Sequence, residues 1–176
     1  MNKSIHKIGF CGVAGSGKTT IAKQLNTKHN YTLLSFASRV KEFAQAILLR
    51  PIDKYNLKDR EFLQFLGTDL ARKRDRNIWL THFNNTYQLH LATGKVKFVV
   101  DDIRFCNEAD FLRKKGFYII KLVGRCNNEM GSCSSHVSET ELENIVPDFI
   151  LDNSGSVKET VQLLKTFLEQ EGGNQN

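Results

Sequence analysis

The chain has 176 residues, of which 40% are hydrophobic and 25% charged, with a formal net charge of +6. Those proportions are ordinary for a globular protein, and the length predicts one domain with a core large enough to be stable. We find no apolar run near the ~18 residues that a membrane span needs and no apolar signal-peptide core, so we expect a cytoplasmic protein without a membrane partner. The charge alone fits a nucleic acid, an anionic small substrate or a solvated basic surface.

The most specific pattern is the glycine-rich segment at residues 12–19, which fits G-x-x-x-x-G-K-[ST], the phosphate-binding loop of P-loop NTPases. A short apolar strand is expected before it, at residues 5–11, and a helix after it. Glycines allow backbone N–H groups to wrap a phosphate, and the following helix presents its positive end to the anion. Lys18 is expected to reach the β- and γ-phosphates of ATP, and the Thr19 hydroxyl to hold Mg²⁺. The residues expected to bind ATP in this segment are Gly12, Ala14, Gly15, Ser16, Gly17, Lys18, Thr19 and Thr20.

A second strand is predicted at residues 31–36, followed by an amphipathic helix that stops before Pro51. A helical insert follows at about residues 59–93, and Gly94 is well placed to cap its second helix. Its two apolar stripes follow helical spacing and are expected to face a core. They consist of Phe62, Phe65, Leu66 and Leu70, and of Trp79, Phe83, Tyr87 and Leu91.

The third predicted strand, at residues 95–102, ends in two carboxylates, Asp101 and Asp102. Asn107 is expected to cap the next helix, and a fourth strand follows at residues 117–123. Residues 125–135 are polar, lack apolar periodicity and predict a loop.

A capping box of Ser138 with Glu141 predicts a short helix that ends before Pro147. A fifth strand is predicted at residues 148–151. A second capping box, Ser156 with Glu159, opens the last helix.

This alternation of strands and helices predicts an α/β fold, a five-stranded parallel sheet flanked by helices, as in P-loop kinases. We expect one domain, residues 1–176, with its core at about residues 5–50 and 95–171. By analogy with P-loop kinases, whose acceptor-binding helices lie between the second and third strands, a helical acceptor-binding insert is expected at about 51–94, and a short lid at about 125–136. Ligands of such sheets bind at the carboxyl ends of the strands. This rule gathers at one edge the loop at 12–19 and residues 35–41, 101–104, 125–136 and 152–156.

Phosphoryl transfer depends mainly on positioning and positive charge, and residues at this edge supply both. Asp101 or Asp102 can hold Mg²⁺ or orient Thr19, and the spacing does not choose between them. Arg104 can clamp an acceptor phosphate with its planar guanidinium, or form a surface ion pair. Arg125 opens the polar loop, where a lid residue would cover the ATP phosphates.

Two other groups have competing interpretations. Arg72 begins a basic run in the insert that can gather acceptor nucleotides or can be a solvated face. A lid held together by a structural zinc ion is suggested only weakly by Cys126, Cys133 and His136, because structural zinc sites use four ligands. The four cysteines lack close pairing, which favours reduced thiols.

Several stretches together resemble the bacteriophage deoxynucleoside monophosphate kinases. Besides the loop, these are residues 35–41, residues 63–72 with Trp79, residues 102–109, and residues 136–139 with 152–153. The resemblance spans most of the chain, and residues 63–72 and 102–109 are its most specific parts. The same group is similar to phosphomevalonate kinase.

The resemblance implies an ATP- and Mg²⁺-dependent kinase that converts a deoxynucleoside monophosphate into the diphosphate. It implies that Asp102, and not Asp101, is the functional carboxylate and metal ligand together with Thr19. The implied catalytic residues are Lys18, Asp102, Arg104 and Arg125, and Arg125 and Asn153 join the ATP site. The implied substrate-binding residues are Ser35, Phe36, Arg39, Lys41, Leu66, Gly67, Thr68, Asp69, Arg72, Trp79, Asp102, Arg104, His136 and Glu139.

Three alternatives stay open. One is a kinase for phosphomevalonate, another a kinase for dephospho-coenzyme A, and the third a nucleotide-binding switch without transferase activity. No nucleic-acid partner is expected, and for a phage protein the compartment would be the host cytoplasm. The sequence does not determine the accepted base or the oligomeric state, for which a homodimer is one option.

Overall fold

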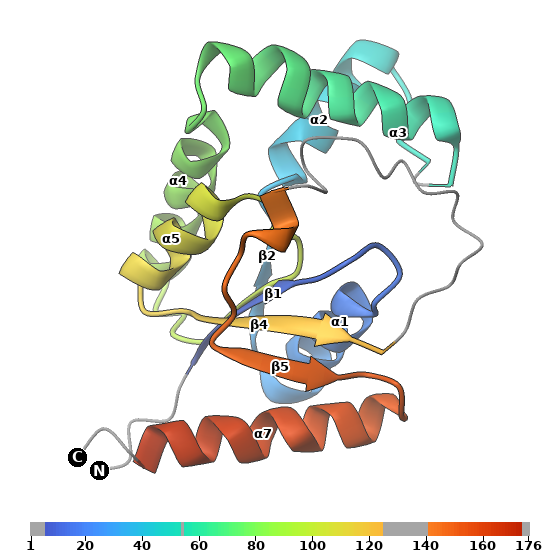
Figure 1. Ribbon diagram of the computed structural model, residues 1–176. Helices are drawn as coiled ribbons and strands as arrows, with labels where there is room; N and C mark the ends of the chain where they lie inside the picture. The colour runs from blue at the N-terminus through green and yellow to red at the C-terminus, as the bar shows by residue number, and fades with distance from the viewer. Residues whose placement is uncertain (1–5, 54, 125–140, 174–176) are drawn as a thin grey trace. The chain divides into compact units, whose positions relative to one another are not determined.

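The computed structural model of this chain describes residues 6–53, 55–124 and 141–173 (Figure 1). Contacts divide the chain into two compact units, which we treat separately. The sheet unit comprises Met1–Leu33 with Lys95–Asn176, and the helical unit comprises Leu34–Gly94. Within the described residues no helix is both long and apolar enough to cross a membrane.

Five strands form one sheet with the spatial order β2-β3-β1-β4-β5. The strands are β1 (Lys7–Cys11), β2 (Thr32–Leu34), β3 (Phe98–Val100), β4 (Tyr118–Val123) and β5 (Phe149–Asp152). Central β1 pairs in parallel with both neighbours, so that Gly9 stands opposite Val100 on one side and Ile119 on the other. The predicted five-stranded parallel sheet is therefore confirmed, with the glycine-rich segment directly after its central strand.

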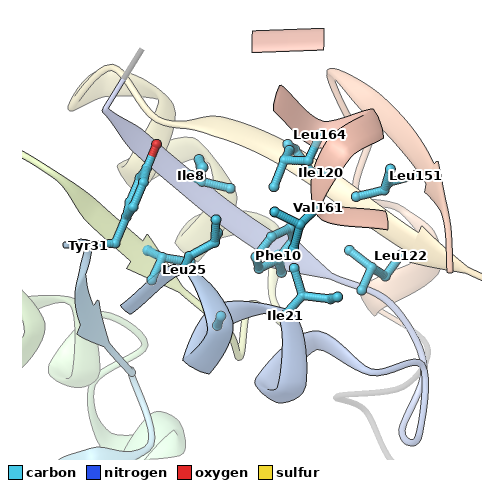
Figure 2. Close-up of a cluster of buried hydrophobic side chains, with 12 residues drawn as sticks. Ile8, Phe10, Ile21, Leu25, Tyr31, Ile120, Leu122, Leu151, Val161 and Leu164 are labelled. Atoms are coloured by element: carbon cyan, nitrogen blue, oxygen red, sulfur yellow. The ribbon is translucent and has the colours of Figure 1, made fainter. Parts of the chain in front are cut away.

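Two helices of the sheet unit, α1 (Lys18–His29) and α7 (Val157–Gly173), pack together on one face of the sheet (Figure 1). Alternation along β1 sends Ile8 and Phe10 to that face, and both are fully buried. Figure 2 shows how side chains from both helices and three strands close over them. The buried cluster comprises Ile8, Phe10, Ile21, Ala22, Leu25, Tyr31, Val99, Ile120, Leu122, Leu151, Val161 and Leu164.

The other face of β1 presents Gly9 to α5 (Cys106–Lys114). A Cβ on Gly9 would lie 2.5 Å from Ile103 Cδ1 and 3.2 Å from Leu112 Cδ1. Glycine at this position therefore leaves the space that Ile103 fills. That packing anchors the segment that follows β3.

The ends of two helices test the capping predictions. At α7 the box is confirmed: Glu159 Oε2 accepts the Ser156 N–H at 2.7 Å, and Ser156 Oγ accepts the Glu159 N–H at 3.2 Å. At α5 the prediction was wrong, because Asn107 lies inside the helix and Phe105 precedes it. The buried Glu108 carboxylate instead accepts the N–H groups of Arg104 and Phe105, the two residues just before the helix, which is the contact that Glu makes in a capping box.

The helical unit contains α2 (Ser38–Leu48), α3 (Leu57–Gln64), a π-helix η1 (Phe65–Arg72) and α4 (Ile78–Ala92). The first predicted stripe fails in η1, where Phe65 is 52% and Leu70 55% exposed. A π-helix bonds i to i+5, so residues five apart, here Phe65 and Leu70, share a face, and residues at the three-residue spacing of an α-helical stripe no longer do. The amphipathic helix expected before Pro51 is α2, in which Val40 and Ala44 are buried, whereas Phe43 and Ile47 are exposed.

The second stripe is confirmed at Trp79, Phe83 and Tyr87, which are all buried. Gly94 follows α4 with a φ of +78°, and its N–H donates to Leu91 O at 2.9 Å, as expected of a cap. The Trp79 indole Nε1–H donates to Gly67 O at 2.8 Å in buried surroundings, which joins α4 to η1. This bond satisfies a backbone carbonyl of the irregular helix.

A two-pronged ion pair joins the end of α2 to the start of α3. Arg50 Nη1 and Nη2 lie 2.7 Å and 2.5 Å from the two oxygens of Asp59, whose side chain is 2% exposed. The Asp53 N–H also donates to Asp59, at 2.8 Å. The hydrogen bond from Arg50, followed by the one from Asp53, lowers the pKa of Asp59 to about 2.

This pair predicts an acid-sensitive contribution to stability. Because the folded-state pKa lies below the ordinary 3.8, the stabilisation is complete above 3.8 and is lost as the pH falls towards about 2. We expect Asp59→Asn to lower the free energy of unfolding above that window and to make little difference below it. Urea unfolding of both proteins across this pH range measures the difference, and a pH-independent difference would contradict the assignment.

Candidate active site

At β1 the strand order of the sheet changes direction, because later strands lie on both sides of β1. The chain leaves β1 towards β2 on one side, while β4 lies on the other. In open parallel sheets such a switch point opens a crevice beyond the strand ends, where ligands bind. Here the residues that follow β1 are the glycine-rich segment.

Glycines shape this segment at the positions where the backbone is left-handed. Gly12, Gly15 and Gly17 have φ values of +133°, +82° and +95°, which side chains with a Cβ rarely tolerate. Gly17 immediately precedes α1, which begins at Lys18. The loop thus delivers the first N–H groups of a helix to the edge of the sheet, an arrangement suited to a phosphate.

Lys18 folds back over this loop. Its Nζ donates to Gly12 O at 2.6 Å, to Val13 O at 2.8 Å and to Ser16 Oγ at 3.2 Å. The ammonium group is therefore already placed at the loop, where phosphate oxygens can replace carbonyl oxygens as acceptors. The neighbouring Thr19 and Thr20 are exposed.

Cys11 ends β1 beneath the loop and is fully buried. Burial raises the pKa of its thiol to about 11, although the charges of Lys121 and Lys18 oppose the shift. The thiol is accordingly neutral at physiological pH and adds no negative charge beside a bound phosphate.

Asn153, after β5, holds the loop from below. Its side chain is 1% exposed; Nδ2 donates to Ser16 O at 2.7 Å, and Oδ1 accepts from Thr160 Oγ1 at 2.8 Å. A Cβ on Gly17 would lie 2.2 Å from Asn153 Nδ2, so glycine and asparagine fit as a pair. Asn153 thus supports the loop through both ends of its amide, and the direct ATP contact that the resemblance implied stays a prediction.

We expect Asn153→Ala to weaken ATP binding by loosening the loop. Leaving the buried Ser16 carbonyl and Thr160 hydroxyl without this partner should also cost about 1–3 kcal/mol of stability. Asn153→Asp provides a matched control, because it keeps the acceptor for Thr160 but places an oxygen against Ser16 O, and it should be at least as harmful. Urea unfolding and titration with an ATP analogue measure both effects; unchanged ATP affinity in both variants would contradict this role.

Asp101 and Asp102 lie where β3 leaves the sheet. The strand was predicted to continue to residue 102, but it ends at Val100. The Phe98 N–H donates to His6 O, and in continued register the Asp102 N–H would reach Phe10 O. Ile103 makes that bond instead, at 3.2 Å, so the segment contains one extra residue, as in a β-bulge.

Beyond this bulge, burial alternates along the chain. Ile103 and Phe105 are buried, whereas Asp102 is partly exposed and Arg104 is exposed. Because β3 runs parallel beside β1, this segment begins at the same sheet edge as the loop. The structure thus brings Lys18, Asn153, Asp102 and Arg104 to one edge of the sheet unit.

The predicted substrate-binding residues from Ser35 to Trp79 belong to the helical unit, and the structure places them within that unit only. Phe36 and Trp79 are buried, and the Phe36 ring stacks on Phe83 with centroids 4.3 Å apart. Arg39 is exposed and pairs with Glu42 at 2.6 Å, and Lys41 is exposed. Ser35, Leu66, Thr68, Asp69 and Arg72 are partly exposed, and Gly67 is buried.

The predicted lid, residues 125–136, lies outside the described residues. The same holds for Arg125, His136 and Glu139, and for the cysteines of the zinc alternative, Cys126 and Cys133.

A parallel sheet whose central strand leads through a phosphate-binding loop into a helix is the arrangement of P-loop nucleotide-binding proteins. Solved structures agree at the level of fold. A gluconokinase from Sinorhizobium meliloti 1021 has a TM-score of 0.56 at 17% identity and covers 97% of this chain and 95% of its own. TT1252 from Thermus thermophilus has a TM-score of 0.56 at 18% identity and covers 94% and 98%.

Sequence comparisons define the family. Residues 47–163 match the family model "Deoxynucleotide monophosphate kinase". A protein of Acanthamoeba polyphaga mimivirus, named "Putative deoxynucleotide monophosphate kinase", is 32% identical over 177 residues, covering 86% of this chain and 90% of that protein. The chain belongs to the deoxynucleotide monophosphate kinase family. These matches establish the family, whereas the bacteriophage origin of the expected relatives finds no support in them.

Proposed function

We propose that this kinase transfers the γ-phosphoryl group of ATP to a deoxynucleoside monophosphate, in the presence of Mg²⁺, and yields the deoxynucleoside diphosphate and ADP. The observation that supports this most is the placement of two cationic side chains at one sheet edge. Lys18 begins α1 and reaches back over the loop after β1, and Arg104 follows β3, the adjacent parallel strand. The reaction joins two phosphate-bearing molecules, so it needs a positive group for each.

The loop and Lys18 would hold the ATP phosphates, and Arg104 the acceptor phosphate. An acceptor phosphate oxygen attacks the γ-phosphorus, and the bond from that phosphorus to the β–γ bridging oxygen breaks. ADP leaves with the electron pair of that bond. The attacking oxygen is already anionic, so positioning and charge neutralisation account for most of the catalysis.

Thr19 and Asp102 would hold Mg²⁺. A hydroxyl and a carboxylate are the hard oxygen ligands this ion prefers, and both side chains have access to solvent at the sheet edge. When bound, the ion supplies positive charge to the β- and γ-phosphate oxygens.

The remaining roles are extensions of the same proposal. The helical unit would contribute acceptor-binding groups, with Arg39, Lys41 and Arg72 as cations and Ser35, Leu66, Thr68 and Asp69 beside them. Phe36, Gly67 and Trp79 would support these groups from within the unit, because they are buried. Arg125, His136 and Glu139 would act from the lid, and residues 51–94 and 125–136 would be the acceptor-binding insert and the lid of one kinase domain.

A screen of deoxy- and ribonucleoside monophosphates with ATP and Mg²⁺, following ADP production, tests the proposal. We expect ADP release that depends on a deoxynucleoside monophosphate. ADP release with phosphomevalonate or dephospho-coenzyme A, and with no nucleotide, would identify one of those kinases instead. Steady ATP hydrolysis that no acceptor stimulates would indicate a nucleotide-dependent switch.

A further inference from the structure

Glu108 is a buried carboxylate for which the proposed reaction has no direct use. It lies in the first turn of α5 and is 2% exposed. One of its oxygens, Oε2, accepts the Arg104 N–H at 2.8 Å and the Phe105 N–H at 3.1 Å. Because burying a carboxylate is costly unless hydrogen bonds compensate, these two bonds are a main reason why it can be buried here.

The same segment is held at further points on both sides of Arg104. The Ile103 N–H donates to Phe10 O at 3.2 Å, and the Ile103 side chain fills the space above Gly9. On the other side, the Phe105 ring is 7% exposed. The backbone of Arg104 is thus held by its bond to Glu108 and by the two buried neighbours, Ile103 and Phe105, while its side chain is exposed at the sheet edge.

We propose that Glu108 is a positioning residue, which fixes the backbone from which Arg104 reaches the acceptor phosphate. This inference rests on the proposed function of Arg104. The bulge shifts the bond to Phe10 O from Asp102 to Ile103, and Glu108 accepts the N–H groups of the two residues that follow. A displacement of about 1 Å at a reacting group can cost a large part of the rate, so such a support has kinetic consequences.

The test is Glu108→Gln, which keeps the size of the side chain and one acceptor oxygen but removes the charge. Charged acceptors bind N–H groups about twice as strongly as neutral ones. We expect KM for the deoxynucleoside monophosphate to rise about 5- to 30-fold, the effect of weakening two such bonds. KM for ATP should stay unchanged, because the loop does not depend on this segment for its hydrogen bonds with Lys18 and Asn153.

A double-mutant cycle with Arg104→Ala separates positioning from simple stabilisation. If Glu108 acts through Arg104, Glu108→Gln should add almost nothing to the acceptor defect when Arg104 is already alanine. Independent, additive effects would overturn the inference. So would Glu108→Gln lowering the melting temperature while leaving both KM values unchanged, which is the result expected of a helix cap alone.

Glu159→Gln is the matched control, because Glu159 makes the equivalent contact at the start of α7. It should change stability without changing KM for the monophosphate. If Glu108→Gln does not fold, the same cycle is run with Glu108→Asp, which keeps the charge but is one methylene too short. If Arg104→Ala alone leaves acceptor kinetics unchanged, the proposed role of Arg104 fails first, a result distinct from failure of the Glu108 cycle.

Discussion

Lys18→Ala is expected to reduce phosphoryl transfer by about 10²–10³-fold, the usual loss when one electrostatic donor is removed from a transition state. The Lys18 ammonium group lies within hydrogen-bonding distance of Gly12 O and Val13 O, at the loop that would hold the phosphates. Its replacement also removes these loop contacts, but the buried core does not depend on this side chain. The fold should therefore survive.

The measurement is steady-state ADP production, with thermal unfolding as the check on folding. Lys23→Ala is the matched control, since Lys23 is exposed on the same helix. It should leave turnover unchanged. A Lys18→Ala enzyme that kept more than about a tenth of the normal turnover would contradict the assignment of the loop.

Arg104→Ala is expected to lower kcat/KM for the monophosphate by roughly 10- to 150-fold. This follows from the loss of charge-assisted hydrogen bonds worth about 1.5–3 kcal/mol. ATP affinity should change much less, because the ATP phosphates are assigned to the loop and Lys18. Kinetics with each substrate varied in turn measure the two effects separately.

Two further variants sharpen this prediction. Arg104→Lys should recover only part of the loss, because a point charge cannot replace the planar guanidinium. Lys114→Ala removes an exposed cation at the end of α5 and should leave acceptor kinetics unchanged. Weaker ATP binding with normal acceptor kinetics in Arg104→Ala would show that the two phosphate sites are assigned the wrong way round.

At the start of α5, two neighbouring residues could each have bound the free N–H groups. Asn107 and Glu108 are adjacent, and either side chain can satisfy the start of a helix. Asparagine at a helix start is the more familiar signal, but the helix begins one residue before it. Glu108 stands three residues after Phe105, the spacing of a capping box without its Ser or Thr. That spacing was the available clue.

Asn153 illustrates a different limit. The resemblance implied that it binds ATP, and in the structure its amide bonds to Ser16 O, in the glycine-rich loop, and to Thr160. Residues 16 and 153 are far apart in sequence, and only the parallel pairing of strands brings them together. The exposure of Phe65 and Leu70 could not be predicted either, because a pattern with helical spacing does not show that η1 is wound as a π-helix.

The sequence by itself determined the order of strands and helices, the phosphate-binding loop and the edge of the sheet where the site lies. These features depend on local signals: apolar periodicity, the glycines at left-handed positions and the capping box at Ser156. The tertiary structure decided the bulge after β3, the support of Arg104 by Glu108 and the support of the loop by Asn153. Each of these is a hydrogen bond or close contact made possible by burial, and burial depends on which distant segments pack together.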